Sequence, residues 1–182
     1  MFLTKTLLLA ILPAIAMGGR INVFRREDSK QCGKFMCVSG KLSGNEVIWT
    51  LESLVPADKV GYMAWGTGQE MKDSQMVVVW RNPENGNTIL SHRTPPCTKE
   101  DDGECNAHHK PQPFQPTTTA TLVAGETDLK GDKAKVTFTR PWDGKASTNF
   151  IFGFSGKNPG SDPKAPLSFH TDFGTFPITL KP

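Results

Sequence analysis

The chain lacks the short motifs that mark most classes of enzyme. It has no Gly-x-Ser-x-Gly nucleophile motif, no His-Glu-x-x-His metal motif and no glycine-rich phosphate loop before a helix. It also has little excess charge, because 21 lysines and arginines face 18 acidic residues and no long run carries one sign. We therefore expect neither a nucleic-acid partner nor catalysis by the chain's own side chains.

Long hydrophobic runs are absent from the chain, apart from one at the N-terminus. Lys5 precedes an apolar run from Leu7 to Ile15, and small residues flank Ile15. The run is shorter than the ~20 residues of a membrane span and is typical of an export signal. Residues 1–18 are predicted to be a signal peptide, and residues 19–182 a secreted domain without a membrane span.

The four cysteines are an even set, which in a secreted chain predicts two disulfides. Sequence spacing favours Cys32–Cys37 and Cys97–Cys105, and the other two connectivities stay open. Neither spacing fits a zinc site.

Periodicity and turn residues predict an all-β fold, an immunoglobulin-like antiparallel β-sandwich. There are 17 glycines and 14 prolines, and no convincing helical period. Met76–Trp80 is continuously apolar, which predicts burial on both faces, and Asn85-Gly86 after it predicts a hairpin turn. The expected strands are 35–39, 46–54, 60–67, 76–81, 88–93, 118–124, 133–139, 149–155 and 174–180. Residues 94–116 are predicted to form a long loop, in which His108 and His109 are solvated rather than paired on a metal.

Two distant segments carry the chemistry. The first, residues 61–80, has Gly66-Thr67-Gly68 followed by Met71, and the second is Phe169-His170-Thr171-Asp172-Phe173-Gly174. Together with Ser91-His92-Arg93, they resemble the DOMON domains and, among these, the b-type cytochrome domain of fungal cellobiose dehydrogenases. The resemblance covers nearly all of residues 19–182. It departs from the family after Arg140, where Pro141-Trp142-Asp143-Gly144 replaces a Cys-x-x-Cys loop.

The resemblance implies that the chain binds haem b, with Met71 and His170 as the axial ligands of the iron. Met76 is the competing sulfur ligand. Such an axial pair closes both iron positions, so the centre transfers electrons and does not activate oxygen. Gly66 and Gly68 carry no side chain and would let a turn come close to the macrocycle.

Further residues are expected near the cofactor. Tyr62, Trp65 and Phe173 could line the porphyrin, although each alone is better explained as core. Arg93 and Lys72 are predicted partners of the haem propionates.

The resemblance also implies partners. An extracellular flavoenzyme or another electron donor would reduce the domain, and a copper-dependent polysaccharide monooxygenase is one class of acceptor. Two alternative functions are a haem-free DOMON module at the cell surface, binding carbohydrate or another ligand through Tyr62, Trp65 and Trp142, and a structural wall domain.

Overall fold

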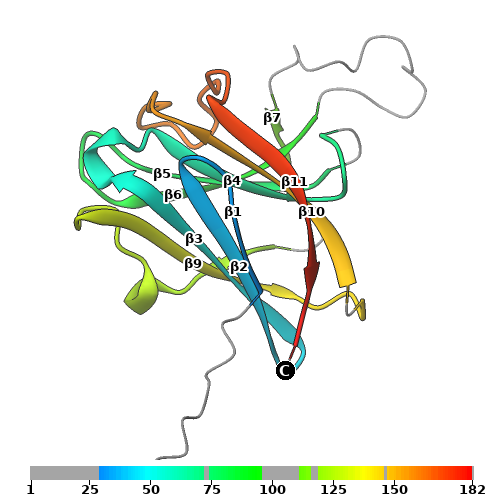
Figure 1. The fold of residues 1–182 in the computed structure, drawn as a ribbon. Coiled ribbons are helices and arrows are strands. Elements are labelled where there is room, and N and C mark those ends of the chain that lie inside the picture. The colour runs from blue at the N-terminus through cyan, green and yellow to red at the C-terminus, as the bar shows by residue number, and fades with distance from the viewer. Residues whose placement is uncertain (1–28, 72–73, 96–110, 116–118, 146, 182) are drawn as a thin grey trace, which may run out of the picture.

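The computed structural model describes residues 29–71, 74–95, 111–115, 119–145 and 147–181, which form two antiparallel sheets (Figure 1). The five-stranded sheet has the order β1 (Ser29–Cys32), β2 (Met36–Ser43), β3 (Glu46–Pro56), β9 (Lys133–Pro141) and β8 (Thr121–Leu122). The six-stranded sheet has the order β11 (Asp172–Thr179), β10 (Ser147–Ser155), β4 (Tyr62–Thr67), β5 (Met76–Arg81), β6 (Thr88–Thr94) and β7 (Gln112–Pro113). The predicted all-β sandwich is confirmed. Two short 3₁₀ helices, η1 (Ala57–Lys59) and η2 (Ala124–Glu126), complete the described elements.

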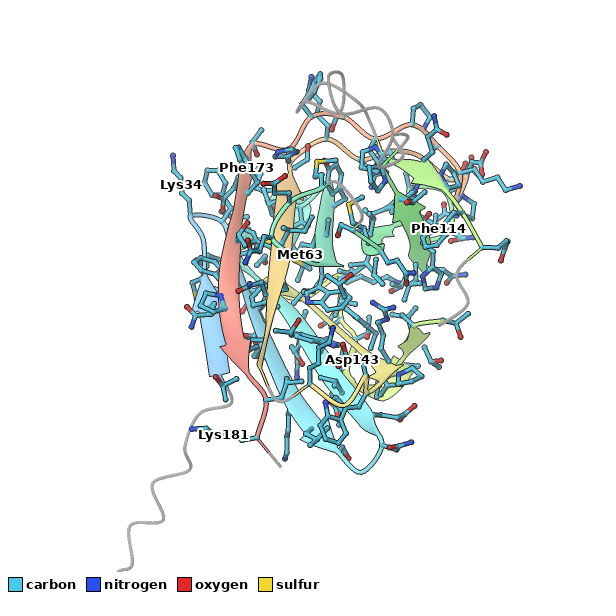
Figure 2. All side chains as sticks on the ribbon, turned by 90° about the vertical axis from the view of Figure 1, so that its right-hand side faces the viewer. Lys34, Met63, Phe114, Asp143, Phe173 and Lys181 are labelled. Carbon is cyan, nitrogen blue, oxygen red and sulfur yellow. A yellow bond between two sulfur atoms is a disulfide. The ribbon has the colours of Figure 1, made fainter. Side chains whose placement is uncertain are left out.

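The core lies between the sheets and is rich in aromatic rings. Trp49 of β3 packs against Trp65 of β4 with ring centroids 4.6 Å apart, and Phe138 of β9 meets Trp65 at 5.7 Å. Met63, two residues before Trp65, is fully buried in the same core (Figure 2). Because side chains alternate along a strand, Tyr62, Ala64 and Gly66 point to the opposite face of the six-stranded sheet, which we call the outer face.

The outer face is also covered. Tyr62, Val78, Trp80 and Ile89 form a second buried cluster with Leu167, which belongs to the loop between β10 and β11. All residues from Met76 to Trp80 are buried, which confirms the prediction that this strand is covered on both faces. The covering segment, residues 156–170, is the one that leads to His170.

Most predicted strands are present, with shifted ends. The segment 76–81 is confirmed without change, and Gly86 has the positive φ (74°) that the predicted Asn-Gly turn requires. The strand expected over 118–124 is wrong in extent, because only Thr121–Leu122 pairs with β9 and a 3₁₀ turn follows. β1 and β7 were not expected.

One predicted disulfide is confirmed. Cys32 and Cys37 are bonded and face each other across the β1–β2 pair. Cys97 and Cys105 lie outside the described residues, as do residues 1–28, Lys72, His108 and His109. In the part of the chain that the structure describes, no helix is long and apolar enough to cross a membrane.

Candidate functional site

His170 lies on the outer face of the six-stranded sheet, directly before β11. Its Cβ and Cγ are 3.7 and 4.0 Å from the point that a Cβ on Gly153 of β10 would occupy, and Ala64 is the cross-strand neighbour of Gly153. The imidazole meets the ring of Phe173 edge-on, with centroids 4.5 Å apart. His170 therefore rests on two small residues and beside one aromatic ring, which extends from the start of β11 (Figure 2).

The environment of His170 suits a metal ligand. Burial lowers the pKa of its imidazole below the ordinary value, so the ring is neutral at pH 7 and keeps a lone pair for a metal. Among the described residues, neither ring nitrogen has a hydrogen-bond partner. A free, neutral imidazole nitrogen is the group that ligates haem iron.

Met71 belongs to the turn between β4 and β5, and several hydrogen bonds draw this turn over the outer face. The Thr175 hydroxyl donates to the carbonyl of Gln69 at 2.7 Å, and the Gly68 amide donates to the carbonyl of Asn149 at 3.0 Å. Thr175 follows Phe173 by two residues and so points to the same face of β11. The turn that carries Met71 and the loop that carries His170 thus reach the same face of one sheet.

The two glycines serve local backbone geometry, Gly68 in this turn and Gly66 near the end of β4. Gly68 has a φ of 103°, which disfavours any residue with a side chain. A Cβ on Gly66 would lie 2.6 Å from the Ser74 hydroxyl oxygen and 2.7 Å from Cγ of Met76. The close approach expected of Gly66 is therefore made to residues of the same turn and of β5.

Met76 also lies on the outer face, opposite Gly66, and is buried. Met71 is half-buried. Because both methionines belong to the same end of the β4–β5 hairpin, the choice of Met71 as the sulfur ligand stays a prediction.

The other predicted site residues separate into two groups. Tyr62 and Arg93 lie on the outer face, where both contact the 156–170 loop: the Tyr62 hydroxyl donates to the carbonyl of Ser168 at 2.8 Å, and Arg93 donates to loop carbonyls. Burial raises the pKa of Tyr62 to about 12. Trp65 lies in the core on the opposite face, so the structure does not bring it together with His170.

The residues on the outer face fit a flat apolar cofactor with polar edges. Phe169 and Phe173, on either side of His170, are 54% and 69% exposed, and neighbouring exposed apolar side chains are typical of a ligand-binding surface. Ser74, next to Gly66 and Met76, is fully buried, and its hydroxyl has no hydrogen-bond partner among the residues that the structure describes. A group with apolar faces would cover the two exposed rings.

Sequence patterns alone missed the residues that hold the site. Gln69 and Thr175 tie the Met71 turn to β11, and Arg140 of the other sheet donates to the Gln75 side chain at 3.2 Å. Their only signal is polarity next to a motif, which is common in any chain. Among the described residues, no group of three or more His, Cys, Asp or Glu side chains is placed to hold a metal ion.

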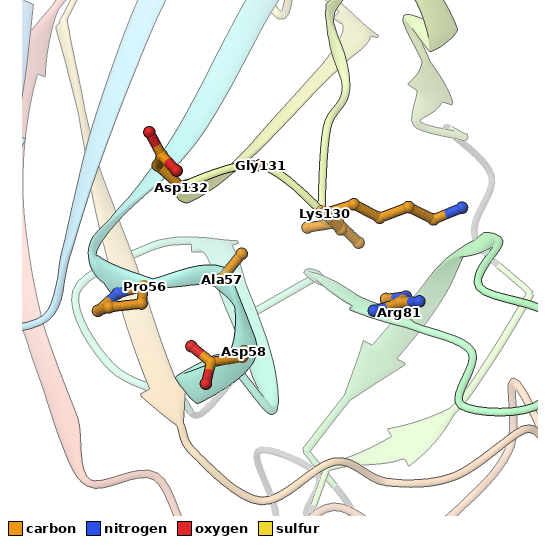
Figure 3. A pocket seen from close by; sticks show the side chains of 8 residues that line it. Pro56, Ala57, Asp58, Arg81, Lys130, Gly131 and Asp132 are labelled. Carbon is orange, nitrogen blue, oxygen red and sulfur yellow. The ribbon is translucent and has the colours of Figure 1, made fainter.

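A separate cavity of about 420 Å³ lies beside η1 and the loop before β9 (Figure 3). Its charged lining residues are Asp58, Arg81, Lys130 and Asp132. None of the predicted site residues lines it, so this cavity is not the candidate site.

Comparison with known proteins identifies the fold as that of cytochrome b domains. The cytochrome b domain of pyranose dehydrogenase from Coprinopsis cinerea has a TM-score of 0.60 at 18% sequence identity, covering 79% of this chain and 76% of that one. The cytochrome domain of Myriococcum thermophilum cellobiose dehydrogenase has a TM-score of 0.60 at 15% identity, covering 80% and 75%. No protein-family model and no curated protein matches the sequence. The likeness to cytochrome domains that the two motif segments predicted is confirmed for the fold.

Proposed function

We propose that this chain is a secreted electron-transfer domain that binds one haem b on the outer face of the six-stranded sheet, with Met71 and His170 as axial ligands. One observation carries the proposal: a neutral, unpartnered His170 and the Met71 turn reach the same face of a fold shared with cytochrome b domains. A haem held by these two residues would supply one-electron redox chemistry without activating oxygen.

The residues of this chain would bind and orient the group. His170 would present its nitrogen, while Phe169 and Phe173 would shield the macrocycle from water. Propionate contacts by Arg93 and Lys72 remain predictions. The Arg93 guanidinium is already bonded to the protein, and Lys72 lies outside the described residues.

The neighbours suggest the kind of partner. Both similar structures are domains of sugar dehydrogenases, which supports a dehydrogenase flavoenzyme as the electron donor. A copper-dependent polysaccharide monooxygenase is the acceptor class that we propose. The chain would then carry electrons between two enzymes and catalyse no reaction of its own.

The alternative function is a haem-free module that binds carbohydrate. Two of the three aromatic residues that would bind the sugar are buried. Tyr62 and Trp65 are 3% and 2% exposed, so neither can stack on a sugar at the surface. Trp142 is partly buried and its indole donates to the carbonyl of Lys145.

Titration of the purified apoprotein with haem tests the proposal. We expect stoichiometric uptake, a Soret band and the sharp reduced α-band of a low-spin six-coordinate cytochrome. His170→Ala and Met71→Ala should lose that spectrum, whereas Met76→Ala and the control His92→Ala should keep it. His92 is a fair control because its imidazole is half-buried like that of His170 but lies beside Phe114, on the face of the sheet opposite the outer face.

Two results would contradict parts of the proposal. A wild-type protein that takes up no haem would refute the function. Loss of the six-coordinate spectrum in Met76→Ala but not in Met71→Ala would refute the ligand assignment and leave the function standing.

A further inference from the structure

Arg93 is a buried cation that forms no ion pair among the described residues, although the charge of Asp162 favours its ionised form from a longer distance. Its side chain is 1% exposed, and no carboxylate of the described residues lies within ion-pair distance. Removing a guanidinium from water is costly unless its N–H groups are satisfied. In this fold, neutral oxygens satisfy them.

Two of these four oxygens belong to the loop before His170. Nη2 of Arg93 donates to the carbonyls of Pro163 and Ala165 at 2.8 and 2.9 Å, and Nε donates to the Ser91 hydroxyl at 2.8 Å. Nη1 makes a longer bond, 3.5 Å, to the carbonyl of Pro111. Arg93 of β6 thus binds two carbonyls, which lie five and seven residues before His170.

Neighbouring side chains of the outer face bind the same loop. Ser91 donates to Pro163 at 2.7 Å, and the Trp80 indole donates to Gly160 at 2.7 Å. Tyr62 donates to Ser168, whose hydroxyl also meets that of Ser155 at 2.9 Å. The loop is therefore fixed along its length, from Gly160 to Ser168, before the chain reaches His170.

We propose that Arg93 is a positioning residue, which holds the 156–170 loop so that His170 stands in its ligating place before haem arrives. The proposal rests on the proposed haem-binding function. A ligand that is already in place loses little conformational entropy on binding, so preorganisation strengthens affinity without any contact to the cofactor. The planar fork of arginine suits several fixed acceptors, which a lysine could meet only in part.

A competing role for Arg93 is direct contact with a haem propionate. The two roles differ in the apoprotein, because a positioning residue holds the loop without haem, whereas a propionate contact forms only when haem is bound. They also differ in whether replacing Arg93 weakens haem binding only when His170 is present.

Hydrogen exchange of the apoprotein is the first measurement. The Ala165 amide donates to Asp162 and the Thr171 amide donates to Phe154, so both report on the loop. We expect Arg93→Met to speed their exchange by about tenfold or more, with core amides of β3 and β9 little changed. Arg93→Lys should recover part of the protection, and the control Arg81→Met, at an exposed arginine, should leave it unchanged.

Haem affinity in a double-mutant cycle is the second measurement. We expect Arg93→Met to weaken haem binding by about tenfold in the wild-type background and to have no further effect in His170→Ala. Should Arg93→Met fail to fold, Ser91→Ala removes one loop bond and the acceptor of Nε, and should show the same pattern more weakly.

Each result is decisive. Direct contact with haem would replace the positioning role if Arg93→Met weakened haem binding but left hydrogen exchange of the apoprotein unchanged. The same conclusion would follow if Arg93→Met caused an equal loss of affinity in the His170→Ala background. Unchanged exchange and affinity would overturn any role in the site. Failure of the wild type to take up haem would refute the proposed function, and this is seen before any variant is compared.

Discussion

Tyr62 is the one tyrosine of the chain, and it links the sheet to the segment that ends in His170. Its hydroxyl donates to the carbonyl of Ser168, and its ring belongs to the buried cluster on the outer face. Replacing it with phenylalanine keeps the ring and removes one hydrogen bond. We expect Tyr62→Phe to lower the free energy of unfolding at pH 7 by about 1–3 kcal/mol, because the carbonyl of the half-buried Ser168 loses its donor.

The pH dependence of the free energy of unfolding provides a second test of the role of Tyr62. Burial raises the pKa of Tyr62 to about 12, whereas the unfolded chain ionises at the ordinary value near 10. The stabilisation from the neutral phenol is therefore complete below about pH 10 and is lost as pH rises from there to 12. One pKa unit corresponds to about 1.4 kcal/mol, so the loss is on the order of 3 kcal/mol.

Two assays check these values. Because no other tyrosine contributes, the absorbance of tyrosinate in the folded protein reports Tyr62 alone. Urea unfolding of the wild type and of Tyr62→Phe, from pH 7 to 11, should show a stability difference that narrows above pH 10. A folded-state titration midpoint near 10, or a difference that does not change with pH, would refute the burial of this phenol.

Two further perturbations test the packing around the site. Gly61→Ala should destabilise the chain by about 3 kcal/mol or more in urea unfolding, because its Cβ would overlap the backbone of Lys157, whereas the control Gly153→Ala should be nearly neutral with its nearest contact at 3.7 Å. Reduction of Cys32–Cys37 should cost only about 2 kcal/mol, since a separation of five residues closes a short loop; a loss twice as large would mean that the bond does more than restrict the unfolded chain.

Strong alternation and turn chemistry made most of the fold predictable from sequence. The uninterrupted apolar strand from Met76 to Trp80 and the turn at Gly86 were found because each has one physical explanation. β1 could not be found in this way, because Ser29–Cys32 contains no apolar alternation and pairs through its backbone and one disulfide. β7 has only two residues, too few for any period.

The residues around the candidate site were only partly predictable. Tyr62 and Trp65 were both expected beside the cofactor, yet they are three positions apart on one strand and must point to opposite faces. Alternation alone excludes one of the two. Which one it excludes depends on the face that the 156–170 loop covers, and this becomes visible only when Tyr62 is seen bonded to Ser168.

The prolines of the 156–170 loop change its balance of hydrogen-bond donors and acceptors. Pro159, Pro163 and Pro166 have carbonyls but no N–H group, so the loop offers more acceptors than donors to the sheet beneath it. The side chains of the sheet that bind these carbonyls are all donors. The Trp80 indole and the Arg93 guanidinium can only donate, and the hydroxyls of Ser91 and Tyr62 donate here. Of the loop carbonyls that accept these bonds, that of Pro163 belongs to a proline, whereas the others belong to Gly160, Ala165 and Ser168. Backbone carbonyls, which any residue supplies, thus bind this irregular segment to the outer face directly before His170.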